Sequence, residues 1–125
     1  MKQIFTKNAP VAIGPYSQAL RVGNMMFVSG QIPVDPETGL MAQDIEVQAR
    51  QSLTNLKNIL AAEGLSMSNV IKTTVFLADL ADFSKVNAVY ESFFEAPYPA
   101  RSCVQVAAIP KGAGVEIECI AICGS

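Results

Sequence analysis

Apolar residues recur every three or four positions in two stretches of the chain, which is the spacing of an amphipathic helix. The first predicted helix runs from Asp44, a suitable N-cap, to Glu63, and Gly64 can end it. The second runs from Asp79, again an N-cap, to Phe94. The apolar stripes consist of Ile45, Ala49, Leu53, Leu56, Ile59 and Leu60 in the first helix and of Phe83, Val86, Tyr90 and Phe93 in the second. Each helix therefore presents one apolar face to a core.

Six shorter stretches predict β-strands, because β-branched or alternating apolar residues gather in them. They are Lys2–Phe5, Ala19–Val22, Met25–Ser29, Val70–Leu77, Arg101–Ala107 and Val115–Cys123. Gly23 and Asn24 predict a hairpin turn between the second and third strands. Residues 110–114 (Pro-Lys-Gly-Ala-Gly) join the last two strands, which we expect to pair. This order of elements predicts one α+β domain over residues 1–125, with both helices packed on one face of the sheet.

The other face of the predicted sheet has no helix to cover it. Side chains alternate between the two faces of a strand. In the fourth strand the helix side should hold Ile71, Thr73, Val75 and Leu77, and the open side Lys72, Thr74 and Phe76. In the last strand the open side should hold Glu116, Glu118, Ile120 and Ile122. Exposing these isoleucines to water is unfavourable. In addition, only 16% of the residues are charged, below the globular average of about 25%. We therefore expect partner subunits on this face.

The residue composition excludes several kinds of chemistry. The chain has no histidine, so Ser-His-Asp or Cys-His catalysis and His-ligated zinc are ruled out. Clusters of hard ligands and cysteine pairs at zinc spacing are also missing, so we expect no metal. The net charge of −2 lacks the basic footprint of nucleic-acid binding. Three cysteines without a disulfide framework, and no segment typical of a signal peptide or bilayer span, indicate a cytoplasmic protein without a membrane partner.

Arg101, Cys103 and Glu118 form a constellation that can carry chemistry. Arg101 and Cys103 share a strand face, and Glu118 lies on the strand expected to pair with theirs. If Arg101 also faces away from the helices, the arginine and the glutamate meet on the open face. A guanidinium binds a carboxylate bidentately, and a glutamate can position a water and accept its proton. The same arrangement fits an ordinary interface salt bridge, and the alternation alone leaves both interpretations open.

Several motifs, in order along the chain, resemble those of the RidA/YjgF family. The resemblance extends from about Asn8 to Ile122. The matching segments are Ile13–Ala19 (IGPYSQA), Phe27–Pro33 (FVSGQIP), Gln48–Leu53 (QARQSL), Lys72–Leu77 (KTTVFL) followed by Asp79-Leu80, Val86–Phe94 (VNAVYESFF), Pro99–Val106 (PARSCVQV) and Val115–Glu118 (VEIE). The agreement of so many ordered segments makes the resemblance specific. The chain departs from the family pattern at residues 96–98 (Ala-Pro-Tyr), where the resemblance implies the rim of a ligand pocket. This departure concerns substrate preference more than reaction type.

The resemblance implies a fold and an activity. The family fold is similar to that of chorismate mutase, and its members are homotrimers whose sheets form a central barrel with ligand sites between subunits. Their reaction is the cofactor-independent hydrolysis of reactive 2-imino acids, such as 2-iminobutanoate and 2-iminopropanoate, to 2-keto acids and ammonia. The expected partners are therefore further copies of the chain and small 2-imino or 2-keto acids.

The resemblance also implies roles for individual residues. Arg101 would clamp the substrate carboxylate, and Glu118 would orient and activate the attacking water. Backbone groups of Gly30 and Cys103 would bind around the reacting carbon and nitrogen. The pocket would be lined by Tyr16, Ser29 and Asn87. The Cys103 thiol is not expected to act as a nucleophile, because no histidine is present to activate it.

Other interpretations of these residues stay open. Gly30 can simply end a strand, Asn87 can only tie a helix to the sheet, and Tyr16 can be an interface aromatic. A protein that senses 2-keto acids at the same clefts would need Arg101 but not Glu118. A ribonuclease, an activity sometimes attached to the family, is disfavoured by the net charge and by the lack of histidine.

Overall fold

The computed structural model describes residues 1–124, and the first apolar stripe forms α1 (Ile45–Ala61). Asp44 caps this helix, since its carboxylate accepts hydrogen bonds from the backbone N–H groups of Glu46 and Val47. Gly64 adopts a φ of 74°, in the left-handed region that glycine tolerates best, and lets the chain leave the helix. The predicted start and stop signals are therefore confirmed.

The second helix is shorter than the sequence pattern predicts. Asp79 does cap a helical turn, because its carboxylate accepts a hydrogen bond from the N–H of Ala81, but this turn is the 3₁₀ helix η2 (Leu80–Asp82). The α-helix proper, α2, spans Phe83–Glu91. The chain then enters the connection 92–99, whose two prolines cannot continue a helix. None of the helices in residues 1–124 is long and apolar enough to cross a membrane.

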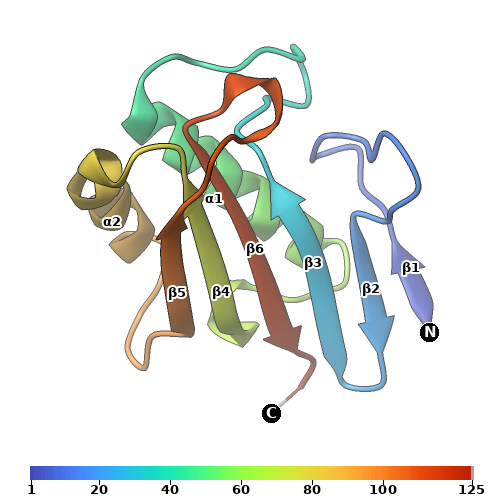
Figure 1. The fold of residues 1–125 in the computed structure, drawn as a ribbon. Helices are drawn as coiled ribbons and strands as arrows, with labels where there is room; N and C mark the ends of the chain where they lie inside the picture. Colours follow the sequence, from blue (N-terminus) through green and yellow to red (C-terminus); the bar gives the residue numbers. More distant parts are fainter. Residues whose placement is uncertain (125) are drawn as a thin grey trace.

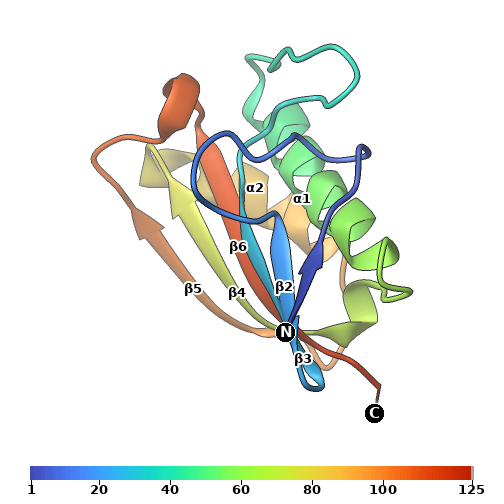
Figure 2. The same cartoon turned by 90° about the vertical axis from the view of Figure 1, so that its right-hand side faces the viewer.

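All six predicted strands form, and they build one mixed sheet. Their bounds are β1 (Lys2–Ile4), β2 (Ala19–Val22), β3 (Met25–Gln31), β4 (Val70–Leu77), β5 (Ala100–Gln105) and β6 (Val115–Ile122). The order across the sheet is β1-β2-β3-β6-β4-β5, and neighbours are antiparallel except β4 and β5, which are parallel. α1 and α2 lie on one side of this sheet (Figure 1, Figure 2). The α+β architecture with both helices on one face is therefore confirmed.

The last two strands do not pair with each other, so the prediction made from the short connection between them is wrong. β6 pairs with β3 and β4, and β4 separates it from β5. The connection crosses the end of β4, where the N–H of Val106 donates to the carbonyl of Leu77 and the N–H of Ala78 donates to that of Gly114. α2 makes the crossover between the parallel strands β4 and β5. The other side of β4 is then available for the final strand.

The core lies between the sheet and α1. The fully buried side chains at its centre are Leu53, Leu56, Ile59 and Leu60 from α1, and Met26, Val75, Leu77, Val115 and Ile117 from the strands. Burying one such leucine or isoleucine stabilises the fold by about 1.5–3 kcal/mol. This core fixes the positions of β3, β4 and β6. The predicted site residues of the sheet lie on β3, on β6 and on β5, which is paired with β4.

One side chain of β4 lies on the opposite face from the one predicted. The pairing with β6 shifts register between Val70, opposite Ala121, and Lys72, opposite Ile120. Ile71 falls in this bulge and is 42% exposed, whereas Val70 is buried in its place. From Lys72 onward, the strand alternates as predicted.

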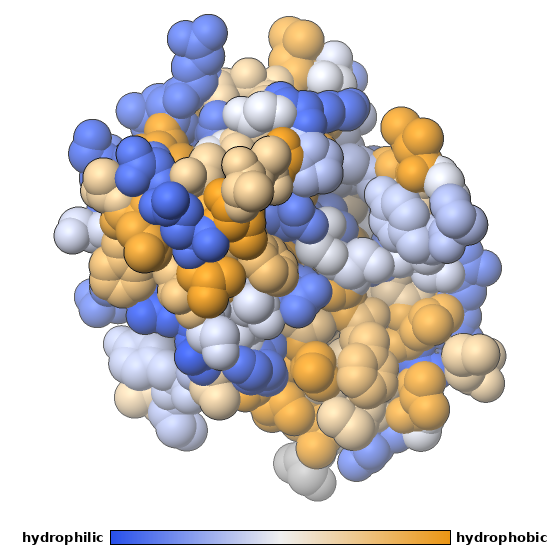
Figure 3. All heavy atoms as spheres, viewed as in Figure 1, coloured by the Kyte–Doolittle hydropathy of each residue, from blue (hydrophilic) through white to orange (hydrophobic). Residues whose placement is uncertain are grey.

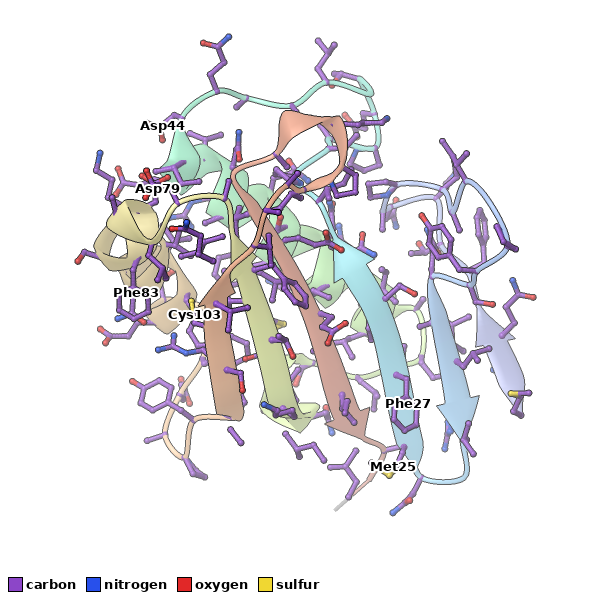
Figure 4. All side chains as sticks on the ribbon, in the orientation of Figure 1. Met25, Phe27, Asp44, Asp79, Phe83 and Cys103 are labelled. Atoms are coloured by element: carbon purple, nitrogen blue, oxygen red, sulfur yellow. The ribbon has the colours of Figure 1, made fainter. Side chains whose placement is uncertain are left out.

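The sheet face away from the helices is uncovered in the single chain (Figure 2). Figure 3 shows apolar residues gathered over the lower part of β3 and β6, and Figure 4 shows Phe27 standing on this face. Phe27 is 43% exposed, and Ile120 and Ile122 are half-buried. This is the surface on which the sequence predicts a partner subunit.

Candidate active site

Arg101 stands on β5 and faces α2 rather than the open face of the sheet. Its partner in the register with β4 is Thr73, which is buried on the helix side. The Arg101 Nη1 donates a hydrogen bond of 2.7 Å to Oδ1 of Asn87. Its guanidinium carbon lies 4.8 Å from the ring centroid of Tyr90 and 5.5 Å from that of Phe83. Arg101 therefore does not meet the condition under which it would share the open face with a glutamate, and the two do not meet there within a single chain.

The Tyr90 ring is held in a single position beside Arg101. Its hydroxyl shares a buried hydrogen bond of 2.7 Å with the hydroxyl of Thr73. Its ring packs on Phe94, with 4.6 Å between the two centroids. Burial raises the pKa of the Tyr90 phenol, although the hydrogen bond with Thr73 and the charge of Arg101 act in the opposite direction. The phenol is therefore protonated and neutral at physiological pH.

Cys103 lies two residues beyond Arg101 on the same side of β5, and it is half-buried. Figure 4 shows it on the strand next to Phe83 of α2. Burial raises the pKa of its thiol, despite the opposing charge of Arg101, and a protonated thiol is a poor nucleophile. Within residues 1–124 β5 is an edge strand, so part of its backbone faces away from β4 and is available to a ligand.

Tyr16, Ser29 and Gly30 lie near the end of β3. The Ser29 hydroxyl donates a hydrogen bond of 2.6 Å to the carbonyl of Ser17, and the Ser29 N–H donates to the carbonyl of Gln18 at 2.9 Å. These bonds fasten the loop that carries Tyr16 to β3. Tyr16 itself is exposed. The loop therefore presents the tyrosine at the surface, while Ser29 has a structural role in holding it there.

Gly30 lies against the side chain of Glu116, a residue without a predicted role. A Cβ at position 30 would lie 2.9 Å from Cδ of Glu116 and overlap its carboxylate, so any larger residue there would displace this side chain. The pairing of β3 with β6 shifts register between Val28 and Gln31, and Gly30 lies within this bulge. Burial raises the pKa of Glu116, and the charge of Glu118 raises it further. A half-buried carboxylate with a raised pKa is a candidate proton-transfer group.

Glu118 stands on the same open face, two residues farther along β6 and in register with Thr74. The shallow hollow of about 240 Å³ that it lines also contains Phe27, Lys72 and Ile120. Alternation gives Glu116 and Glu118 the same face, so a sequence pattern cannot separate them. The bulge that brings Glu116 into contact with β3 depends on strand pairing, and its one local signal is the glycine at position 30.

The predicted site residues other than Glu118, together with Glu116, form two groups that do not meet within one chain. We call Asn87, Arg101 and Cys103 the arginine half-site, and Tyr16, Ser29, Gly30 and Glu116 the glycine half-site. Across the sheet Gln31 pairs with Ile117, Ile117 with Val75, and Val75 with Cys103. The half-sites are therefore three strands apart, about 14 Å at the usual spacing of strands. Their charged residues also face opposite sides of the sheet, so a pocket that uses both halves needs a second chain.

Known proteins of the same sequence pattern and fold identify the family. The family model described as Endoribonuclease L-PSP matches residues 6–123. The 2-iminobutanoate/2-iminopropanoate deaminases of Salmonella typhimurium and Escherichia coli are each 56% identical to this chain, over 97% of it and 97% of their own length. The crystal structure of E. coli TdcF with bound serine has a TM-score of 0.96 and 53% identity, and covers 99% of this chain and 100% of that one. The E. coli YjgF gene product has a TM-score of 0.95 and 54% identity, with 98% of both chains covered. The chain therefore belongs to the Endoribonuclease L-PSP family, which is the RidA/YjgF family that its motifs resemble.

Proposed function

We propose that this protein is a 2-iminobutanoate/2-iminopropanoate deaminase, a cofactor-independent hydrolase that converts reactive 2-imino acids to 2-keto acids and ammonia. Relatives at 56% identity carry this name. The observation that carries the proposal is the environment of Arg101. Within the described chain its guanidinium forms no ion pair, and it is held by Asn87 and two aromatic rings. Its charge is therefore free to bind the carboxylate that 2-imino acids share.

The reaction needs this arginine and one group that transfers protons. Arg101 fixes the carboxylate and thereby the neighbouring carbon of the protonated imine. Water adds to that carbon while one of its protons passes to the Glu116 carboxylate, which gives a tetrahedral carbinolamine. Glu116 returns the proton to the nitrogen, the C–N bond breaks, and ammonia takes up the hydroxyl proton as the keto acid forms. Positioning of reactants is worth several kcal/mol, and a placed acid–base group contributes about 10²–10⁴-fold.

Glu116 is a better candidate for the proton-transferring group than Glu118, to which the family resemblance assigned that role. The Glu116 carboxylate lies against Gly30, and its pKa is raised by burial. Glu118 lines the hollow farther along the open face. The variants Glu116→Gln and Glu118→Gln form a matched pair, because they make the same change two positions apart on one strand. We expect E116Q to lose about 10²–10⁴-fold in turnover and E118Q to retain most of it. The reverse result would return the role to Glu118.

We also propose that the active site is completed in a homotrimer, where the arginine half-site of one chain meets the glycine half-site of the next. The separation of the half-sites supports this arrangement. So does the exposure of apolar residues on the open face and on the loop of the glycine half-site, where Ile13 is 75% exposed. Three sheets closed into a barrel would cover the open face of each copy.

The cytoplasm is the location we propose for this activity. Cys103, Cys119 and Cys123 are free in the structure, which suits reducing conditions. Burial raises the pKa of the Cys119 thiol to about 12, so this thiol stays protonated. A protonated, buried thiol resists oxidation. The ligands there would be small 2-imino acids released by other enzymes, and the 2-keto acids formed from them.

The activity is tested with a threonine dehydratase as the source of the imine. Keto acid formation is followed with and without the protein, at high pH or with rapid detection, because free imines hydrolyse quickly in water. We expect the wild type to accelerate keto acid formation and Arg101→Ala to abolish that acceleration while the assembly stays intact. A wild type that adds nothing to the spontaneous rate contradicts the proposed function.

A sensor of small carboxylates is the second candidate, because the structure of the relative TdcF contains bound serine. A sensor needs Arg101 but no group that transfers protons. Calorimetry with a keto acid on Glu116→Gln separates the two functions. Retained binding with lost turnover supports the enzyme. Binding by the wild type without turnover above the spontaneous rate supports the sensor.

A further inference from the structure

The guanidinium of Arg101 is surrounded by neutral groups. The amide oxygen of Asn87 accepts a hydrogen bond from Nη1 at 2.7 Å, and the rings of Tyr90 and Phe83 lie 4.8 and 5.5 Å from the guanidinium carbon. Amide oxygens and ring faces attract a cation without carrying a negative charge. Arg101 is therefore held in place while its charge stays uncompensated within residues 1–124.

The groups around Arg101 belong to one rigid unit. Phe83, Asn87 and Tyr90 are spaced by four and three positions on α2, so they lie above one another on one face of the helix. The hydrogen bond between the Tyr90 and Thr73 hydroxyls ties this face to β4. Thr73 is fully buried, and it is the residue with which Arg101 pairs in register. The arginine and the helix face beside it are thus fixed to the same strand.

We propose that Thr73, Phe83, Asn87 and Tyr90 form a neutral cradle that orients Arg101 for the substrate carboxylate, and that position 87 must be uncharged to keep this arginine available. The proposal rests on the proposed function of Arg101. An aspartate at position 87 would accept the same hydrogen bond but would place a negative charge about 2.7 Å from the guanidinium nitrogen. The resulting ion pair would compete with the carboxylate of the substrate.

The variant Asn87→Asp separates this role from a purely structural one. If Asn87 only tied α2 to β5, aspartate would replace it well, because the size and the hydrogen bond are kept. We expect an assembled protein with an unchanged or higher Tm whose affinity for 2-oxobutanoate, measured by calorimetry, falls by at least about tenfold. KM for the imine should rise with little change in kcat. Wild-type affinity in N87D would overturn the requirement for a neutral residue.

Thr73 is tested with variants that keep its shape. Thr73→Val replaces the hydroxyl with a methyl group, and Thr73→Ser keeps a hydroxyl. Thr73 is buried behind Tyr90 and acts on Arg101 through that ring. We expect T73V to raise KM about threefold to tenfold and T73S to restore most of the loss. A folding defect alone would lower the active fraction, and hence the apparent kcat, without moving KM. Equal, wild-type KM values in both variants would overturn the positioning role.

The variants Phe83→Leu and Phe93→Leu provide a matched control. Each phenylalanine ring has an arginine over it, Arg101 at 5.5 Å from Phe83 and Arg50 at 5.9 Å from Phe93. Only Phe83 belongs to the cradle. We expect F83L to weaken 2-oxobutanoate binding about threefold or more and F93L to leave it unchanged. Equal affinities in the two variants would remove the ring of Phe83 from the cradle.

Arg101→Ala, measured in the same calorimetric titration, distinguishes failure of the cradle from failure of the proposed function. If this variant binds 2-oxobutanoate like the wild type, Arg101 is not the carboxylate clamp and the proposed function loses its main support. If it loses binding while N87D, T73V and F83L keep wild-type affinity, the clamp stands and the cradle is overturned. Loss of binding in Arg101→Ala together with weaker binding in the cradle variants supports both.

Discussion

Glu116 is a carboxylate that the fold holds in an unfavourable environment. Burial, and then the charge of Glu118, raise its pKa in the folded protein. The folded state therefore binds this proton more tightly than the unfolded chain does. The free energy of unfolding consequently decreases as the pH rises from the unfolded pKa through the folded one, and above that interval the folded state carries the full penalty. A raised carboxyl pKa is typical of groups that transfer protons.

We expect Glu116→Gln to raise the melting temperature at neutral pH, because glutamine carries no charge and removes this penalty. The gain should disappear well below the usual glutamate pKa of 4.5, where the wild type is protonated in both states. Thermal unfolding between about pH 3 and pH 8 measures the effect. Glu118→Gln should give a smaller gain, because it removes only the charge that adds to the burial penalty of Glu116. An E116Q protein that is less stable than the wild type at neutral pH would show that the carboxylate stabilises its surroundings instead.

The sequence predicts the elements well because helix and strand periodicity are local properties. Asp44 and Asp79 both cap helical turns where they were expected to. The bulges at Ile71 and at Gly30 were not predicted, since each depends on pairing with β6, far along the chain. The side on which Arg101 stands was left open by the sequence, because it depends on the register of β5 with β4, which is also a non-local pairing. The residue types of the candidate site could therefore be predicted, but the contact between Glu116 and Gly30 could not.

The loop between β1 and β2 is held by one buried glutamine. Gln18 is 2% exposed, and its Oε1 accepts a hydrogen bond from the N–H of Thr6. Its Nε2 donates to the carbonyls of Thr6 and Pro10 at 3.0 and 2.8 Å, and more weakly to that of Ala9 at 3.4 Å. The Gln18 side chain thus forms hydrogen bonds with backbone groups of the loop that do not pair with a neighbouring strand. This loop carries Tyr16 of the glycine half-site.

We expect Gln18→Glu to loosen the loop although the side chain keeps its size. A carboxylate oxygen would face the carbonyl oxygens in place of Nε2, so the donated hydrogen bonds are lost and like partial charges meet. The expected decrease in unfolding free energy is about 1–3 kcal/mol, together with lower activity because Tyr16 is displaced. Denaturant unfolding and the imine assay measure both effects, with the exposed Gln43→Glu as control. Wild-type stability in Q18E would mean that other contacts fix the loop.

The whole molecule combines an apolar open face with two incomplete half-sites. Both features have the same explanation if copies of the chain close their sheets into a barrel. The half-buried isoleucines and Phe27 would then lie against neighbouring copies, and each junction between chains would hold one pocket. The shared pocket therefore requires the trimer, and evidence against the trimer is also evidence against the shared pocket.

We expect light scattering to give a mass about three times the 13.3 kDa of one chain. Phe27→Asp places a charge on the open face and should yield smaller species that lose imine hydrolysis, because desolvating an unpaired carboxylate opposes association. Leu40→Asp, an equally severe change of an exposed residue in the loop after β3, is the control. A monomer mass for the wild type at micromolar concentration contradicts both the trimer and the shared pocket.

The distance between the half-sites has a genetic consequence. Arg101→Ala damages only the arginine half-site, and Glu116→Gln only the glycine half-site. In a ring assembled from both variants, one junction joins the intact Arg101 of one chain to the intact Glu116 of the next. Random assembly from equal amounts leaves about a quarter of all junctions intact. Two inactive alleles should thus complement each other in one cell, and a co-refolded mixture of the purified variants should regain about that fraction of wild-type activity. A mixture no more active than its parents would mean that each chain holds its own complete site.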